Sequence, residues 1–216
     1  MLRRFLLLML LGALVAPISG KASGVIDFGL AGGGAVTWSG GTAPLVGTDI
    51  AINTVCGIDT PLNDGVCFNV TDGFLSFTTG SYSGSDASNW YFNGGGTITV
   101  DGTIAGLGIF DATLMSGSWT QANVFALGDG VGIVGGNYND TKNVALAAYF
   151  GLGSTGWQGT LNPSIAYIGA PGSPINAMAM AGDVVNSSPI PEPASMALLG
   201  SGLLSLGAMI RRKRAS

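Results

Sequence analysis

Residues 67–79 read CFNVTDGFLSFTT, two runs rich in β-branched and aromatic residues on either side of an Asp-Gly pair. Asp-Gly is a preferred pair in type I′ hairpin turns, because both turn positions need a positive φ. The spacing therefore predicts a hairpin that turns at Asp72-Gly73. The same arrangement recurs around Asp101-Gly102 and Asp129-Gly130, so we expect two further hairpins there.

Short runs of this kind fill residues 23–168 and recur every ~8–12 residues, a spacing typical of a sandwich or barrel. We therefore predict an all-β fold, a glycine-rich antiparallel β-sandwich-like domain. A β-solenoid remains the alternative, because it also suits short glycine-rich strands. Residues 48–55 are expected to form a strand. Glycine-rich flanks favour a strand over a helix at 144–150, and residues 170–188 are expected to add an edge strand before a linker.

The composition is unusual for a globular protein. The 216 residues include 37 glycines, and only 9 % are charged, whereas average proteins have about 7 % glycine and about 25 % charged residues. Between residues 22 and 190, eleven aspartates face a single basic residue, Lys142, which gives a formal charge of −10. We expect Lys142 to lie in a surface loop. A body so acidic repels phosphate backbones, so we expect no nucleic-acid partner.

Residues 1–22 have the three parts of a secretory signal peptide. Arg3 and Arg4 form the positive start, residues 5–16 form the apolar run, and small residues follow, with cleavage expected after Gly20 or Ala22. The apolar run is too short to cross the ~30 Å core of a bilayer as a helix. An uncleaved amino-terminal anchor is the alternative.

A second membrane signal is predicted at the other end of the chain. A proline-rich linker over 187–193 precedes an uncharged run over 194–210, and a tail over 211–216 closes the chain. A helix over this run would reach about 25 Å, the lower limit for a membrane span. Because basic residues stay cytoplasmic, the tail is expected inside and the β-domain over 23–186 outside. The stop-transfer cluster consists of Arg211, Arg212, Lys213 and Arg214.

This carboxy-terminal arrangement resembles the PEP-CTERM sorting signal. The motif residues are Pro191, Glu192 and Pro193, followed by a Leu/Gly-rich span and the basic cluster. Ile190 stands where the family often has valine. The resemblance covers residues 189–214 only and does not extend to the chemistry of the body. An ordinary tail anchor with a proline-rich stalk is the alternative.

The resemblance implies a partner and a location. A membrane enzyme of transpeptidase type, called exosortase, reads such motifs in Gram-negative bacteria that make extracellular polysaccharide. The precursor would be anchored in the inner membrane with a periplasmic body, and the processed protein would reach the cell surface or the extracellular matrix.

Cys56 and Cys67 are the only cysteines, and they flank a turn sequence that contains Pro61 and Asn63-Asp64-Gly65. In an oxidising compartment, such a pair is most simply a disulfide. A zinc site would need more ligands, because the chain has no histidine and two thiolates do not complete it. We therefore predict a Cys56–Cys67 disulfide.

The sequence contains no recognisable catalytic constellation. The absence of histidine excludes histidine-based triads, and a Ser–Lys dyad would depend on Lys142. The GxGxxG match at 151–156 is attributed to chance, because no helix start follows it. We therefore expect no enzyme and no cofactor. Structural calcium held by loop aspartates and asparagines is the one metal alternative.

The body is therefore expected to be a non-catalytic surface or matrix protein associated with exopolysaccharide or biofilm. Two alternatives remain. Trp90 and Tyr91 are candidates for stacking on sugar rings in a carbohydrate-binding or adhesive module, although large aromatics more often form the core. A hydrolase using paired aspartates is less favoured.

Overall fold

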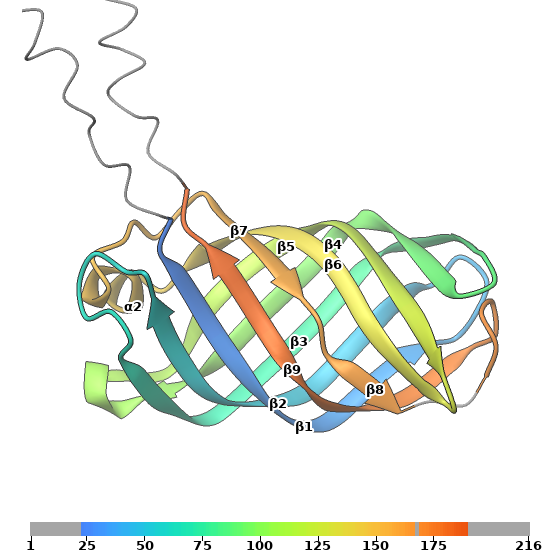
Figure 1. Ribbon diagram of the computed structural model, residues 1–216, viewed down its shortest axis with the longest axis horizontal. Coiled ribbons are helices and arrows are strands. Elements are labelled where there is room, and N and C mark those ends of the chain that lie inside the picture. The colour runs from blue at the N-terminus through green and yellow to red at the C-terminus, as the bar shows by residue number, and fades with distance from the viewer. Residues whose placement is uncertain (1–22, 167–168, 190–216) are drawn as a thin grey trace, which may run out of the picture. The chain divides into compact units, whose positions relative to one another are not determined.

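The computed structural model describes residues 23–166 and 169–189. The predicted signal peptide, the motif residues 191–193, the span over 194–210 and the basic tail lie outside these residues. The described part contains nine strands in one antiparallel sheet, a 3₁₀ turn and a short helix (Figure 1). These elements are β1 (Val25–Trp38), β2 (Pro44–Ile58), β3 (Cys67–Ser85), β4 (Asn89–Ile104), η1 (Ala105–Leu107), β5 (Ile109–Gly128), β6 (Val131–Lys142), α2 (Val144–Tyr149), β7 (Trp157–Leu161), β8 (Ser164–Ala166) and β9 (Ile175–Ser187).

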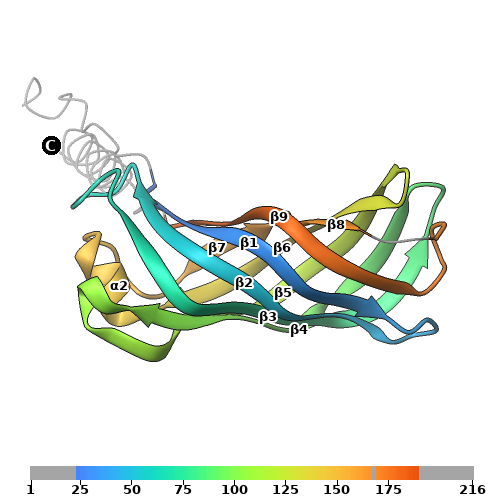
Figure 2. The same ribbon diagram turned by 90° about the horizontal axis from the view of Figure 1, so that it is seen from below.

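The sheet closes on itself. Each strand from β1 to β6 pairs with the next one in the chain, and β9 pairs with β1. β7 and β8 together occupy one position between β6 and β9. They are separated by Asn162-Pro163, where proline has no N–H to give to the ladder. The result is a closed antiparallel barrel of eight strand positions (Figures 1 and 2).

The closed sheet confirms the all-β antiparallel prediction and corrects its architecture. The predicted β-sandwich would need two sheets packed face to face, whereas here one sheet curls until β9 meets β1. The alternative of a β-solenoid is not supported either, because neighbouring strands run antiparallel in chain order. Residues 170–188, expected to contain an edge strand, hold β9, which has partners on both sides. Closure thus leaves the sheet without a free edge.

Only one of the three predicted Asp-Gly turns is a turn. Asp129 and Gly130 join β5 to β6 with φ values of 52° and 72°, as a two-residue hairpin requires. Asp72-Gly73 and Asp101-Gly102 instead lie inside β3 and β4, where the register between these strands shifts. The left-handed backbone of Asp72 (φ 49°) serves a β-bulge, and both strands continue past these pairs. The expected strand at 48–55 is part of β2.

Residues 144–149 form helix α2 and not the expected strand. The side chain of Asn143 caps it, since its Oδ1 accepts hydrogen bonds from the backbone N of Ala145 (3.0 Å) and of Leu146 (3.4 Å). Asparagine is a preferred N-cap, and alanine and leucine favour helix. Leu146 and the following Phe150 are fully buried. This anchoring outweighs the glycine-rich flanks.

The barrel interior is filled with side chains. Its largest fully buried members include Trp90, Trp157, Tyr138, Phe28 and Phe150, as expected of a barrel with about eight strands. We call the end that carries α2 and both described chain ends the proximal end (Figure 2). There, the backbone N of Ser188 donates to the carbonyl of Gly24 at 2.8 Å. The opposite, distal end carries the β3–β4 and β5–β6 turns.

Candidate functional site

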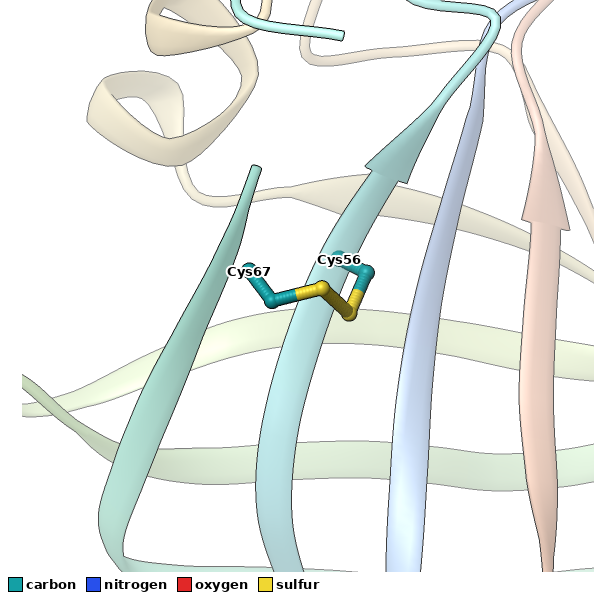
Figure 3. Close-up of a disulfide and its surroundings, with 2 residues drawn as sticks. All are labelled: Cys56 and Cys67. Carbon is teal, nitrogen blue, oxygen red and sulfur yellow. A yellow bond between two sulfur atoms is a disulfide. The ribbon is translucent and has the colours of Figure 1, made fainter. Parts of the chain in front are cut away.

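The predicted disulfide is confirmed. Cys56 and Cys67 stand opposite each other on β2 and β3 and are bonded, with their Cα atoms 4.1 Å apart (Figure 3). The loop between them lies at the proximal end and is also held to the segment after α2, where the backbone N of Leu62 donates to the carbonyl of Phe150 at 3.1 Å. The disulfide therefore stabilises a loop that packs against the helix.

The candidate sugar-stacking pair is divided between the two faces of β4. Trp90 is fully buried, and its Nε1 donates to the carbonyl of Ser173 at 3.0 Å. Its predicted stacking on an external sugar is therefore wrong, because the ring has no exposed face. Successive strand residues point to opposite faces, so Tyr91 lies outside, with 40 % of its surface exposed.

Tyr91 is anchored to the β3–β4 turn. Its hydroxyl donates to Asp86 Oδ2 at 2.6 Å. Asp86 Oδ1 accepts from the backbone N of Ser88 and of Asn89, both at 2.8 Å. The hydrogen bond from Tyr91, followed by that from Ser88, lowers the pKa of Asp86 to about 2. The same carboxylate raises the pKa of Tyr91. The ring is thus held beside a turn whose carboxylate is ionised at neutral pH.

A groove of about 630 Å³ lies beside this ring on the outer face of β3, β4 and β5. Asn93 Nδ2 donates to Ser81 Oγ at 3.0 Å, and Asn123 Nδ2 donates to Asn89 Oδ1 at 3.4 Å, so the two amides are oriented. The groove is uncharged along its lining. The lining residues are Ser83, Tyr91, Phe92, Asn93, Gly94, Thr120, Gln121, Ala122 and Asn123.

This groove could not be predicted from the sequence, because its β4 members (91–94) and its β5 members (120–123) are about 30 residues apart along the chain and meet only when β4 pairs with β5. The alternation of Tyr91 and Asn93 around a buried Phe92 was the one available signal.

The expectation that Lys142 lies in a surface loop is wrong, because its side chain lies inside the barrel. Its Nζ donates to Asp140, both side chains are 0 % exposed, and the ammonium lies 4.7 Å from the centre of the Trp157 ring. Burial lowers the pKa of Lys142 to about 8 and raises the pKa of Asp140. Tyr138 and Asn186 continue this polar cluster, with the Tyr138 hydroxyl 2.8 Å from Asn186 Oδ1.

One pair of aspartates bears on the hydrolase alternative. Asp27 on β1 and Asp183 on β9 lie on the outer face, and burial and then the charge of Asp183 raise the pKa of Asp27. Neither residue lines the groove beside Tyr91 or the hollows at the β1–β2 turn and on the β5–β6–β7 face. Paired-carboxylate hydrolysis needs both carboxyl groups in one cleft, and none of these three hollows contains Asp27 or Asp183.

Three features of the described residues concern metal binding, membrane spans and surface charge. No three of their acidic, cysteine or histidine side chains come together to hold a metal ion. None of their helices is long and apolar enough to cross a bilayer, and the predicted membrane helix falls outside them. Their only basic side chain is Lys142, whereas ten aspartates other than Asp140 are at least partly exposed.

Residues 189–213 match the family model of the PEP-CTERM protein-sorting motif. The resemblance at the carboxy-terminal end is therefore confirmed, and it assigns no family to the body. No curated protein and no solved structure matches the chain.

Proposed function

We propose that this chain is the precursor of a non-catalytic surface or extracellular-matrix protein that an exosortase-type enzyme processes at Pro191-Glu192-Pro193. The match of residues 189–213 to the sorting motif carries this proposal. Such a motif implies an exported, membrane-anchored precursor that is processed. The periplasmic position of the body and its later association with exopolysaccharide are the finer parts of the proposal.

The disulfide supports export. Disulfides persist in oxidising compartments such as the periplasm and are rare in the cytosol. Cys56 and Cys67 are both used in one bond, and they are the only cysteines of the chain. The body is thus suited to the compartment to which the sorting signal would deliver it.

The carboxy-terminal end of the barrel supports processing at the motif. Asn186 is fully buried, and its Nδ2 donates to the carbonyl of Ile26 at 3.1 Å across the β1–β9 seam. Ser188 is also buried, whereas Pro189 is exposed. A cut near residues 191–193 would therefore leave every residue of the barrel seam in the mature protein.

The chemistry of the described side chains supports a non-catalytic role. The only lysine of the body is paired with Asp140 inside the barrel, where both side chains are 0 % exposed, so its ammonium is engaged away from solvent. Asp27 on β1 and Asp183 on β9 line neither the groove beside Tyr91 nor the two other hollows described above. The exported protein would then act through its surface.

The test uses the full chain, produced in a bacterium that has the processing enzyme and in a strain that lacks it. Mass spectrometry of each cell fraction determines the mature carboxy terminus. Glu192→Ala alters the motif, and Pro174→Ala, in the β8–β9 connection, is the matched control outside the 189–213 region.

We expect the wild type and Pro174→Ala to appear outside the cell without the basic cluster 211–214. Glu192→Ala, and the wild type in the deficient strain, should keep the cluster and remain in the membrane fraction. Mature extracellular protein that still carries residues 211–214 would contradict the proposal.

A further inference from the structure

We propose that the groove beside Tyr91 binds a neutral polysaccharide. The inference rests on the association with exopolysaccharide in the proposed function and deepens it by naming the binding surface and the class of glycan, whereas the groove itself belongs to the barrel whether or not the chain is sorted. It rests on the shape of the groove, the chemistry of its lining, the anchoring of its aromatic ring and the charge around it.

The shape depends on a glycine where two strands approach closely. Gly94 on β4 lines the groove, as does Ala122 on β5, although only 4 % of Ala122 is exposed. A Cβ on Gly94 would lie 2.5 Å from the carbonyl oxygen of Thr120, so the close approach of β4 and β5 at this point requires glycine. The volume of about 630 Å³ falls within the range of about 300–1,000 Å³ found for small-ligand sites.

The lining has the groups that a sugar needs. A pyranose ring presents C–H faces and a rim of hydroxyls that both donate and accept. The exposed ring of Tyr91 offers an apolar face with a polar tip, and the exposed amide of Gln121 both donates and accepts. Asn93 and Asn123 use their NH₂ groups within the protein, which leaves their amide oxygens as acceptors.

The ring is fixed before any ligand arrives. The Tyr91 hydroxyl donates to Asp86, which also accepts from the backbone N of Ser88 and of Asn89, and these hydrogen bonds hold the side chain at the edge of the groove. A platform that is already ordered loses less conformational entropy on binding. Asp86 caps the β3–β4 turn by accepting hydrogen bonds from its backbone. That capping role does not require an exposed aromatic ring at position 91.

Charge selects the class of polysaccharide. The described surface carries ten aspartates, and its only basic side chain, Lys142, is buried. A uronate or sulfate group would find no cation there and would meet a field of its own sign. Asp86, at the edge of the groove, stays ionised because its pKa is about 2. Uncharged glycans avoid this repulsion.

The test applies the full-length chain, purified in detergent, to an array of neutral glycans such as glucans, mannans and xylans. The same array carries alginate and other acidic glycans, and unglycosylated polypeptides, as comparisons. Affinity for the best-bound neutral oligosaccharide is then measured by calorimetry. We expect binding to neutral glycans and none to the acidic ones. No neutral glycan bound, or binding to acidic glycans or polypeptides only, overturns the proposal.

Variants locate the site. Tyr91→Ala should weaken glycan binding by about tenfold, because stacking of a sugar on the Tyr91 ring should contribute about as much free energy as a contact between two aromatic rings. Tyr91→Phe keeps the ring but loses the bond to Asp86, and should stay within about threefold of the wild type. Phe110→Ala removes another exposed aromatic, 64 % exposed and near η1, and should change nothing.

Unchanged affinity in Tyr91→Ala, or an equal loss in Phe110→Ala, refutes the assignment of the groove. Tyr91→Phe and Tyr91→Ala both lose the hydrogen bond to Asp86, and only Tyr91→Ala loses the ring. An equal loss of glycan affinity in the two variants would therefore point to a disturbed turn and would overturn the role of the ring. If the protein is processed normally but binds no glycan, this inference is refuted and the proposed delivery still stands.

Discussion

Replacing Lys142 by methionine tests the buried ion pair inside the barrel. The variant leaves Asp140 with no cation, in a site where both side chains are 0 % exposed. Asp140 Oδ2 already has no hydrogen-bond partner among the described residues. Removing one member of a buried pair typically costs about 3–5 kcal/mol, so the free energy of unfolding at pH 7 should fall by about that amount.

The deficit should depend on pH. Burial raises the pKa of Asp140 even beside Lys142, whose charge lowers it, and the variant loses that opposing influence. A carboxyl whose folded pKa lies above the unfolded value of about 3.9 loses stability as pH rises between the two values. The Lys142→Met protein should therefore be closest to the wild type near pH 4 and furthest from it at neutral pH.

The wild type should show a second, opposite dependence. Burial lowers the pKa of Lys142 to about 8, whereas the unfolded value is about 10.4. Between these values the unfolded chain binds more protons, so wild-type stability should rise with pH through this group. Lys142→Met should lack this rise.

Guanidinium titrations followed by tryptophan fluorescence provide the assay, because the Trp157 ring lies 4.7 Å from the Lys142 ammonium. The double variant Asp140→Leu/Lys142→Met is the matched control. Exchange of a whole buried pair for apolar residues is often neutral or stabilising, so this protein should lie within about 1 kcal/mol of the wild type or above it. A loss under about 1 kcal/mol in the single variant, or a double variant less stable than the single one, would refute the reasoning.

Two further predictions concern stability. Cys56→Ser/Cys67→Ser opens a loop with a sequence separation of 11 and should lower the free energy of unfolding by about 3 kcal/mol, measured by denaturant titration; equal stability of the two proteins would contradict a structural role. Gly159→Ala places a Cβ 2.2 Å from Tyr138 Cε2 and Cζ and should cost about 1–3 kcal/mol. Its control is Gly153→Ala, where a Cβ meets nothing within 4 Å. Equal melting temperatures of the two variants would show that the clash with Tyr138 does not destabilise the barrel.

Several features of this protein could be predicted from sequence because they depend on local chemistry. Two cysteines around a turn are close in any fold that makes the turn, so the disulfide between Cys56 and Cys67 was predictable. Antiparallel strands follow from short alternating runs, and Asp129-Gly130 forms the turn that its residues favour. The sorting motif is a linear signal, so residues 189–213 reveal it without a fold.

The tertiary structure decided what alternation and turn chemistry leave open. Period two tells which residues share a face but not which face is inside, so only closure of the barrel placed Trp90 and Lys142 within and Tyr91 outside. Positive φ suits a bulge as well as a turn, and the pairing of β3 with both neighbours settled Asp72-Gly73 as a bulge. The groove exists only where β3, β4 and β5 lie side by side, because strand pairing joins residues that are far apart in the chain.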